Sequence, residues 1–172
     1  MERAARTGGG VTYPRFVELW FVQLYQAEHD KVFRATWAFC GDRGVAEDAT
    51  QEAFARALER WPRLREQPWV TGWVTSTALN AARRLQRRRW PHRPETAPVG
   101  IAAAADAFGS VELWQVVRAL PRRQREAVTL HYLVDLPVAQ VARLMGCREG
   151  TVKAHLAHAR KALRAQLEGS AR

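Results

Sequence analysis

Cysteine is scarce in this chain. Of 172 residues only Cys40 and Cys147 are cysteines, and neither belongs to a C-x-x-C pair. A disulfide framework and a cysteine-rich zinc site are therefore excluded, and each thiol is expected to be free and buried. The sequence also lacks the glycine-rich, nucleophile and zinc-binding signatures of phosphate-binding loops, serine hydrolases and metallopeptidases. These absences argue against an enzyme.

Long apolar runs are missing too. No stretch of 18 apolar residues occurs, so no membrane insertion is expected. The first ten residues contain two arginines but no apolar segment, so no signal peptide is expected and the chain is placed in the cytoplasm. His155 and His158 stand three apart, yet no cysteine or carboxylate lies at a supporting spacing. We therefore expect neither a metal nor a cofactor.

Acidic residues are few relative to basic ones. The chain has 27 lysines and arginines against 17 acidic residues, which gives a net charge of +10. Such a balance predicts a polyanionic partner, either nucleic acid or an acidic membrane surface. Hydrophobic residues make up 47% of the chain, enough to bury the core of one domain or two small ones.

Apolar residues recur at helical spacing along most of the chain, which predicts an all-α fold. We expect two small helical domains, residues 13–90 and 111–168, joined by a flexible linker over 91–110. The linker contains three prolines, two glycines and a run of alanines. A bend is expected in the first helix near Glu28–Asp30, and Pro62 should end the second helix.

The last third of the chain has the spacing of a helix-turn-helix. Ala142 is followed by Gly146 four residues later, and Val152 comes six residues after that. A small residue lets two helices approach, a glycine turns the chain, and a branched apolar residue closes the core between them. A second helix held in this way fits the major groove of DNA. An ordinary helical hairpin is the alternative.

A basic segment follows an apolar one between residues 73 and 90. No acidic residue occurs between Gln67 and Pro94, whereas six arginines do. A charge run is usually a solvated face. Here it continues an apolar helix and ends beside Trp90, so it is also a plausible surface for phosphates and unstacked bases.

Three stretches, in this order, resemble the sigma-70 family of bacterial sigma factors, in its extracytoplasmic-function (ECF) group. Residues 46–54 resemble the family's signature helix, residues 73–89 its promoter −10 segment, and residues 120–153 its −35 module. The resemblance extends from Tyr13 to Glu168. It implies an alternative sigma factor that binds core RNA polymerase, recognises −35 and −10 elements and assists promoter melting.

The resemblance also assigns roles to residues. It implies that core polymerase is bound at Asp48, Gln51, Glu52, Phe54 and Arg56. Within this set, Phe54 helps to shape the contact surface. It implies −10 contacts at Trp61, Trp73, Asn80, Arg83, Arg84, Arg87 and Arg88, although at least one of the tryptophans near this segment is expected in the core. It implies −35 contacts at Arg148, Thr151, Lys153, Ala154, His155, His158 and Arg160.

Two departures from the family pattern limit the inference. Arg84 stands where members often have an acidic residue, and Ala154, His155 and His158 replace the serine and arginine of many recognition helices. The −35 sequence therefore stays open, and histidine predicts pH-sensitive binding there because its charge changes near neutral pH. A merely solvated acidic face is the alternative to a polymerase contact on the helix that contains residues 46–54.

Core RNA polymerase and promoter DNA are the expected partners, and the resemblance leaves room for an anti-sigma protein. Three rival functions stay open at this point. One is a dimeric DNA-binding regulator that needs no polymerase. Another is a protein that docks on polymerase without reading promoters. The third is an enzyme, which no group of residues supports.

Overall fold

The structure is a computed structural model and describes residues 15–90 and 111–170. The expected linker, residues 91–110, lies outside the described residues, as do residues 1–14. The described residues form helices and no strands, which confirms the all-α class. The elements are α1 Arg15–Cys40, α2 Arg43–Glu59, α3 Trp61–Leu64, α4 Val70–Arg89, α6 Val111–Ala119, α7 Arg122–Val128, the π-helical turn η1 Thr129–Leu133, α8 Val138–Met145 and α9 Glu149–Ser170.

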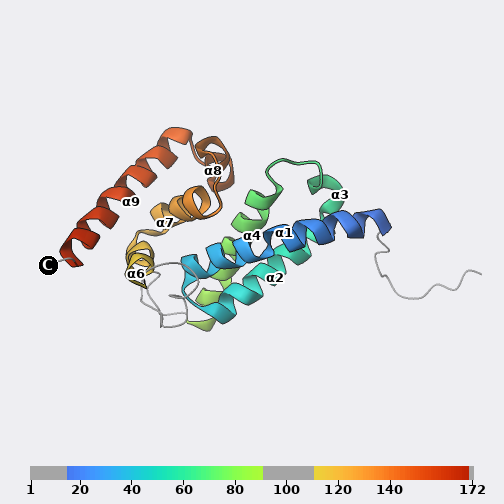
Figure 1. Ribbon diagram of the computed structural model, residues 1–172, viewed down its shortest axis with the longest axis horizontal. Coiled ribbons are helices and arrows are strands. Elements are labelled where there is room, and N and C mark those ends of the chain that lie inside the picture. The colour runs from blue at the N-terminus through green and yellow to red at the C-terminus, as the bar shows by residue number, and fades with distance from the viewer. Residues whose placement is uncertain (1–14, 91–110, 171–172) are drawn as a thin grey trace, which may run out of the picture.

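The N-terminal half consists of α1, α2 and α4 packed together, with the short α3 at one end (Figure 1). Helix α2 presents a stripe of small residues to its neighbours, all fully buried: Ala46, Ala49, Ala53 and Ala57. Small side chains allow close helix approach. Asp42 caps α2 by accepting a hydrogen bond from the Val45 N–H at 2.8 Å.

Helix α1 is continuous through Glu28–Asp30, where a bend was expected. The segment contains neither proline nor glycine, the usual causes of a kink. An aromatic cluster instead holds α1 on α2 and α3. The Phe21 ring lies edge-on to Trp61 with centroids 5.4 Å apart, and Tyr25 lies edge-on to Phe54 at 4.9 Å.

The C-terminal half contains the expected helix-turn-helix. Gly146 ends α8 in the left-handed conformation with φ +63°, and the Cys147 N–H donates to the Ala142 carbonyl at 3.0 Å. Val141, Ala142 and Val152 are buried between α8 and α9. The predicted role of the glycine turn is confirmed. After α7 the chain widens into the π-helical turn η1, where the Val134 N–H donates to the Thr129 carbonyl.

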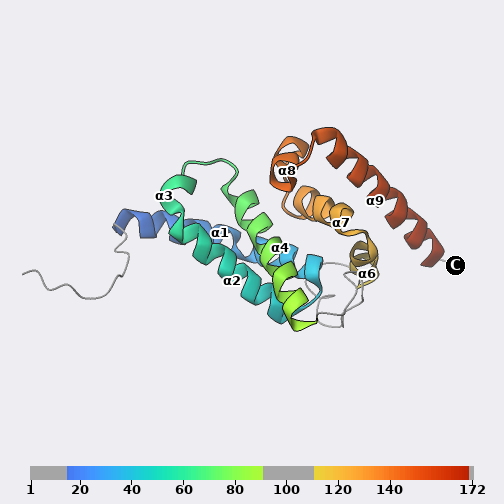
Figure 2. The same ribbon diagram turned by 180° about the vertical axis from the view of Figure 1, so that it is seen from behind.

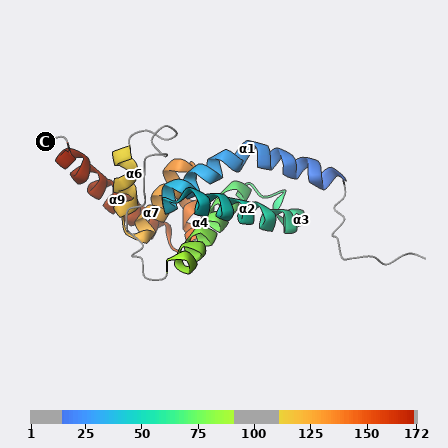
Figure 3. The same ribbon diagram turned by 90° about the horizontal axis from the view of Figure 1, so that it is seen from below.

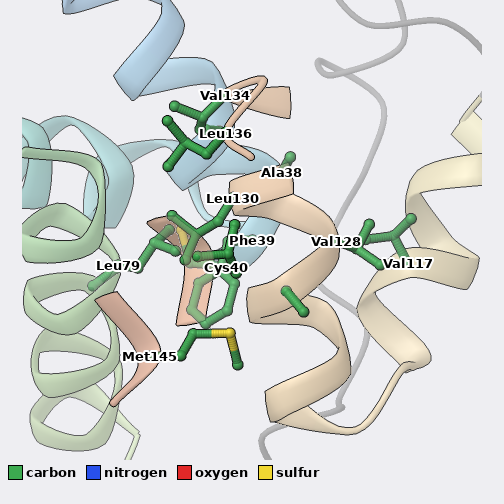
Figure 4. Close-up of a cluster of buried hydrophobic side chains, with 14 of the residues drawn as sticks. Ala38, Phe39, Cys40, Leu79, Val117, Val128, Leu130, Val134, Leu136 and Met145 are labelled. Atoms are coloured by element: carbon green, nitrogen blue, oxygen red, sulfur yellow. The ribbon is translucent and has the colours of Figure 1, made fainter. Parts of the chain in front are cut away.

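The two halves lie side by side, and the view from behind shows the same arrangement (Figure 2). They share one hydrophobic cluster rather than having fully separate cores. Phe39 and Cys40 at the end of α1, Leu79 of α4, and Leu130 and Met145 of the C-terminal half meet there (Figure 4).

Helix α4 lies beside α2, as the view from below shows (Figure 3). Across the boundary between the halves, α4 also contacts α8 and η1. Gly72 permits this approach, because a Cβ atom at its position would lie 2.9 Å from Leu136 Cδ1 and 3.0 Å from Leu144 Cδ1. No real Cβ contact is so short without a shift of its neighbour.

Charged side chains also cross the boundary. Arg118 Nε donates to the Ala38 carbonyl at 3.4 Å, and Arg125 Nη1 donates to the Phe39 carbonyl at 3.0 Å. Both carbonyls belong to the last turn of α1, where the C-terminal end of a helix attracts cations.

Candidate nucleic-acid and polymerase interfaces

One candidate surface is the outer face of α2. Asp48, Gln51 and Arg56 are exposed there. Phe54 lies beneath them with 3% of its surface exposed, so it supports this face from inside and cannot itself be a contact. The structure therefore brings together the exposed members of the predicted polymerase-binding set on one side of the helix.

Glu52, also predicted to contact polymerase, is occupied within the chain. Its carboxylate accepts from Arg56 at 2.7 Å and also from Arg84, which lies 32 positions further along the chain on α4. Arg84, the residue that departs from the family pattern, thus connects the α2 surface to the basic helix. Nothing in the sequence around either residue signals this pairing.

The second candidate surface is the basic face of α4. Asn80, Arg83, Arg84, Arg87 and Arg88 recur at helical spacing and line one cleft of about 430 Å³. Arg122, at the start of α7, lines the same cleft from the other half. The sequence analysis did not single out Arg122, because its place beside α4 depends on how the halves pack.

The tryptophans predicted for the −10 region are placed differently from one another. Trp61 is 3% exposed and packs against Phe21, so it belongs to the core and not to an open surface. Trp73 is half-buried, with the Arg60 guanidinium 5.7 Å from its ring centroid. Trp69 lines a second, more apolar pocket of about 310 Å³ with Gln140, Arg143 and Leu144 of α8. The prediction of DNA contact by Trp61 is corrected on this ground.

The third candidate surface is the outward face of α9 and the turn before it. Val152, Leu156 and Ala159 are buried, which fixes the helix orientation. His155 is half-buried. The remaining predicted −35 residues are all exposed: Arg148, Thr151, Lys153, Ala154, His158 and Arg160. The structure therefore gathers the predicted set on the free side of the second helix of the helix-turn-helix.

Three charged residues of α6 and α7 are buried where the halves meet: Arg118, Arg125 and Glu126, each with 5% or less of its surface exposed. Glu126 lies 4.0 Å from Arg83 of α4 and 3.4 Å from Arg123. Desolvation by burial lowers the pKa of Arg118 because it disfavours the charged guanidinium. Sequence reasoning missed these residues, because their partners in the N-terminal half lie 43 to 86 positions away along the chain.

Cys40 is buried at the same boundary, where its thiol donates to the Asp42 carbonyl at 3.3 Å. Burial raises the pKa of this thiol to about 12, since the thiolate would be poorly solvated. Cys147 is also a free thiol, only partly buried. Both observations agree with the expectation of unpaired cysteines.

Two features are absent from the described residues: a metal-binding group and a membrane-spanning helix. Neither half contains a group of three histidine, cysteine or acidic side chains placed to hold a metal ion. Among the helices of residues 15–90 and 111–170, none is both long and apolar enough to span a bilayer.

Comparison with known families gives two matches. The profile described as "Sigma-70 region 2" matches residues 24–91, and "Sigma-70, region 4" matches residues 110–163. The first contains the α2 and α4 surfaces, and the second contains the helix-turn-helix.

Individual proteins agree with these matches. The "Probable RNA polymerase sigma-C factor" of Mycobacterium bovis is 33% identical over 138 residues, covering 76% of this chain and 75% of that protein. The "ECF RNA polymerase sigma factor BldN" of Streptomyces coelicolor is 32% identical over 144 residues, covering 77% of this chain and 54% of that protein.

Solved structures share the fold. The sigma factor RpoE of Bartonella quintana, in complex with the anti-sigma factor NepR, superposes with a TM-score of 0.72 at 20% identity, covering 86% of this chain and 96% of that one. CnrH, in complex with the cytosolic domain of CnrY, superposes with a TM-score of 0.68 at 21% identity, covering 87% of this chain and 88% of that one.

Proposed function

The chain belongs to the ECF group of the sigma-70 family, and from this premise we propose which of its surfaces carry out each step of transcription initiation. As a sigma factor it binds core RNA polymerase and directs initiation at promoters, through region 2 for the −10 element and region 4 for the −35 element. The division of labour among individual residues is our proposal.

We assign polymerase binding to the exposed face of α2, at Asp48, Gln51 and Arg56. The contrast between the two sides of α2 supports this assignment. Its outer side has exposed polar residues, whereas its inner side consists of fully buried alanines. Glu52 then acts through its ion pairs with Arg56 and Arg84 and holds the contact surface in place. Phe54 supports it from below.

We assign −10 binding to Asn80, Arg83, Arg87 and Arg88 of α4, with Trp69 and Trp73 near its start. Arginine neutralises backbone phosphates, and an aromatic ring can stack on an unpaired base, worth about 1–3 kcal/mol per base. Extruding a base costs a few kcal/mol, so one or two such stacks can offset it. Arg84 contributes positive potential while paired with Glu52.

We assign −35 binding to α9 and its preceding turn. Thr151, Lys153, Ala154 and His155 lie near the start of the helix, where side chains reach base edges, and His158 and Arg160 lie further along, near phosphates. Arg148 precedes the helix. The exposure of these residues over the buried Val152 supports the assignment.

Binding a promoter requires the two halves to separate. The −10 and −35 elements are centred about 25 base pairs apart, or roughly 85 Å at 3.4 Å per base pair, whereas α4 and α8 touch each other here. A 20-residue segment such as 91–110 spans about 60–70 Å when extended. We propose that this structure is a closed form and that polymerase and DNA bind an open one.

Three further points complete the proposal. The chain acts as an initiation factor without catalysis of its own, in the cytoplasm where RNA polymerase works. We propose an anti-sigma protein as the regulatory partner, because one structural neighbour, the sigma factor RpoE, was solved in complex with an anti-sigma factor. It would bind the closed form.

Reconstituted transcription tests the assignment. The purified chain is added to sigma-free core polymerase on a pooled promoter library, and the RNA 5′ ends are sequenced. Discrete starts with shared upstream elements are expected. Absence of starts despite co-purification with core would favour a docking protein, and a duplex shift without core binding would favour a simple regulator.

Matched variants separate the surfaces. Arg87→Gln with Arg88→Gln should reduce promoter opening far more than core binding. Asp48→Ala with Gln51→Ala should do the reverse. Glu59→Gln, exposed on the same helix α2, is the control and should change neither. Equal loss of both activities in the arginine variant would count against the assignment.

A further inference from the structure

The cleft between α4 and α7 has features that promoter binding does not explain. Four arginines and Asn80 line it from α4 at positions 80, 83, 84, 87 and 88, one face of the helix. Arg122 lines it from the other half. In the open form that promoter binding requires, Arg122 would leave this group, so the complete cleft exists only in the closed form.

The charge within the cleft is strongly one-sided. Among the residues that the structure describes, five of the six that line it are arginines and the sixth is Asn80. Within the same residues, Glu52 pairs with Arg84 and Glu126 lies beside Arg83. Each of these carboxylates also pairs with an arginine outside the cleft, Arg56 and Arg123 respectively. Gathered like charges repel, and an anion between them would offset that repulsion.

The chemistry of the lining defines the class of anion. Arginine presents a planar fork of donors that matches two oxygens of one phosphate, and Asn80 adds a neutral donor. One phosphate group would engage only one or two of the five guanidinium groups. A volume of about 430 Å³ falls within the range of small-molecule sites.

We propose that this cleft binds a small anion with two or more linked phosphate groups, and that the bound anion links α4 to Arg122 and holds the two halves together. The anion and promoter DNA would then compete for the same arginines of α4. This competition rests on the proposed function, whereas anion binding itself does not.

Inorganic tripolyphosphate is the probe, titrated into the full chain by calorimetry at physiological ionic strength. Arg122→Gln should weaken binding about tenfold or more, because it removes the only guanidinium supplied by the C-terminal half. Arg164→Gln, exposed on α9 outside the cleft, is the matched control and should change affinity less than twofold. Undetectable binding, or equal loss in both variants, would overturn the proposal and indicate general attraction to a basic chain.

The reactivity of Cys40 provides a second readout. This thiol is 3% exposed in the shared cluster, so a thiol reagent reaches it only when the structure opens. In a Cys147→Ser background, tripolyphosphate should slow labelling of Cys40, and Arg122→Gln should abolish the slowing. A labelling rate independent of the anion would refute its role in holding the halves together.

A short single-stranded oligonucleotide distinguishes the two phosphate sources. Arg122→Gln should leave its affinity nearly unchanged, whereas the Arg87 and Arg88 variants should weaken it. An Arg122 effect as large as that on tripolyphosphate would show that the cleft is part of the DNA path. Failure of the arginine variants in transcription, with tripolyphosphate binding intact, would instead overturn the proposed function alone.

Discussion

Arg118 and Arg125 both place a guanidinium against the last turn of α1, but their hydrogen bonding differs. Arg125 donates to the Phe39 carbonyl at 3.0 Å and lies 5.1 Å from the centroid of the Phe39 ring. Arg118 donates to the Ala38 carbonyl over a long 3.4 Å, and its Nη1 makes no hydrogen bond with the described residues; the same holds for the Nε of Arg125. Replacing each by methionine keeps much of the aliphatic stem and removes the charge.

The expected changes have opposite signs. A buried donor without a partner destabilises the folded state by about 1–3 kcal/mol. A hydrogen bond as long as 3.4 Å is weak and offsets little of this cost. Arg118→Met should therefore raise the free energy of unfolding by about 1–2 kcal/mol. A hydrogen bond from a charged donor contributes about 1.5–3 kcal/mol, and a cation over a ring adds about 0.5–2. The cost of the unsatisfied Nε offsets part of this gain, so Arg125→Met should lower the free energy of unfolding by about 1–2 kcal/mol.

Urea denaturation followed by circular dichroism, at one pH and ionic strength, measures both changes. Arg164→Met is the control, because this exposed arginine should alter stability by less than about 0.5 kcal/mol. If Arg118→Met destabilised the chain as much as Arg125→Met, the hydrogen-bond geometry would not explain the stability of the boundary and the reasoning would fail.

Three further predictions concern other sites. Asp42→Ala removes the cap of α2 and should lower the free energy of unfolding by about 1 kcal/mol in the same denaturation assay; no change would show that water replaces the cap. Burial raises the pKa of the Cys40 thiol from its ordinary value of 9.0 to about 12, so the folded state favours the protonated thiol. The stability that this preference contributes is fully present below pH 9.0 and is lost as the pH rises toward about 12. Cys40→Ala should therefore flatten the fall of stability in that window, and an unchanged slope would contradict the burial argument. Gly72→Leu inserts a side chain against Leu136 and Leu144 and should enlarge the radius of gyration measured by X-ray scattering, with an unchanged radius refuting the close packing of α4 on α8.

The helix-turn-helix could be predicted because its signals are local. Ala142, Gly146 and Val152 lie within eleven positions, and each acts through its own size or backbone freedom. The same holds for the face of α9, whose exposed residues follow from the buried stripe. The exposed face of α2 could be inferred for the same reason.

The packing of the halves could not be predicted, since it depends on contacts between distant residues. Arg118 reaches Ala38 across 80 positions, and Arg125 reaches Phe39 across 86. Trp61 illustrates the limit on a smaller scale. The family resemblance implied that Trp61 contacts DNA, and only the approach of Phe21 from α1 shows that its ring is buried.

The buried charges at the boundary also bear on solubility. When the halves separate, the apolar residues around Leu130 and Met145 come into contact with water, and large exposed apolar patches promote self-association. Arg118, Arg125 and Glu126 would become hydrated at the same moment and interrupt that patch with charge. A boundary without these charges would expose an uninterrupted apolar surface at each opening. In the open form that the proposed function requires, we therefore expect the three charges to limit self-association.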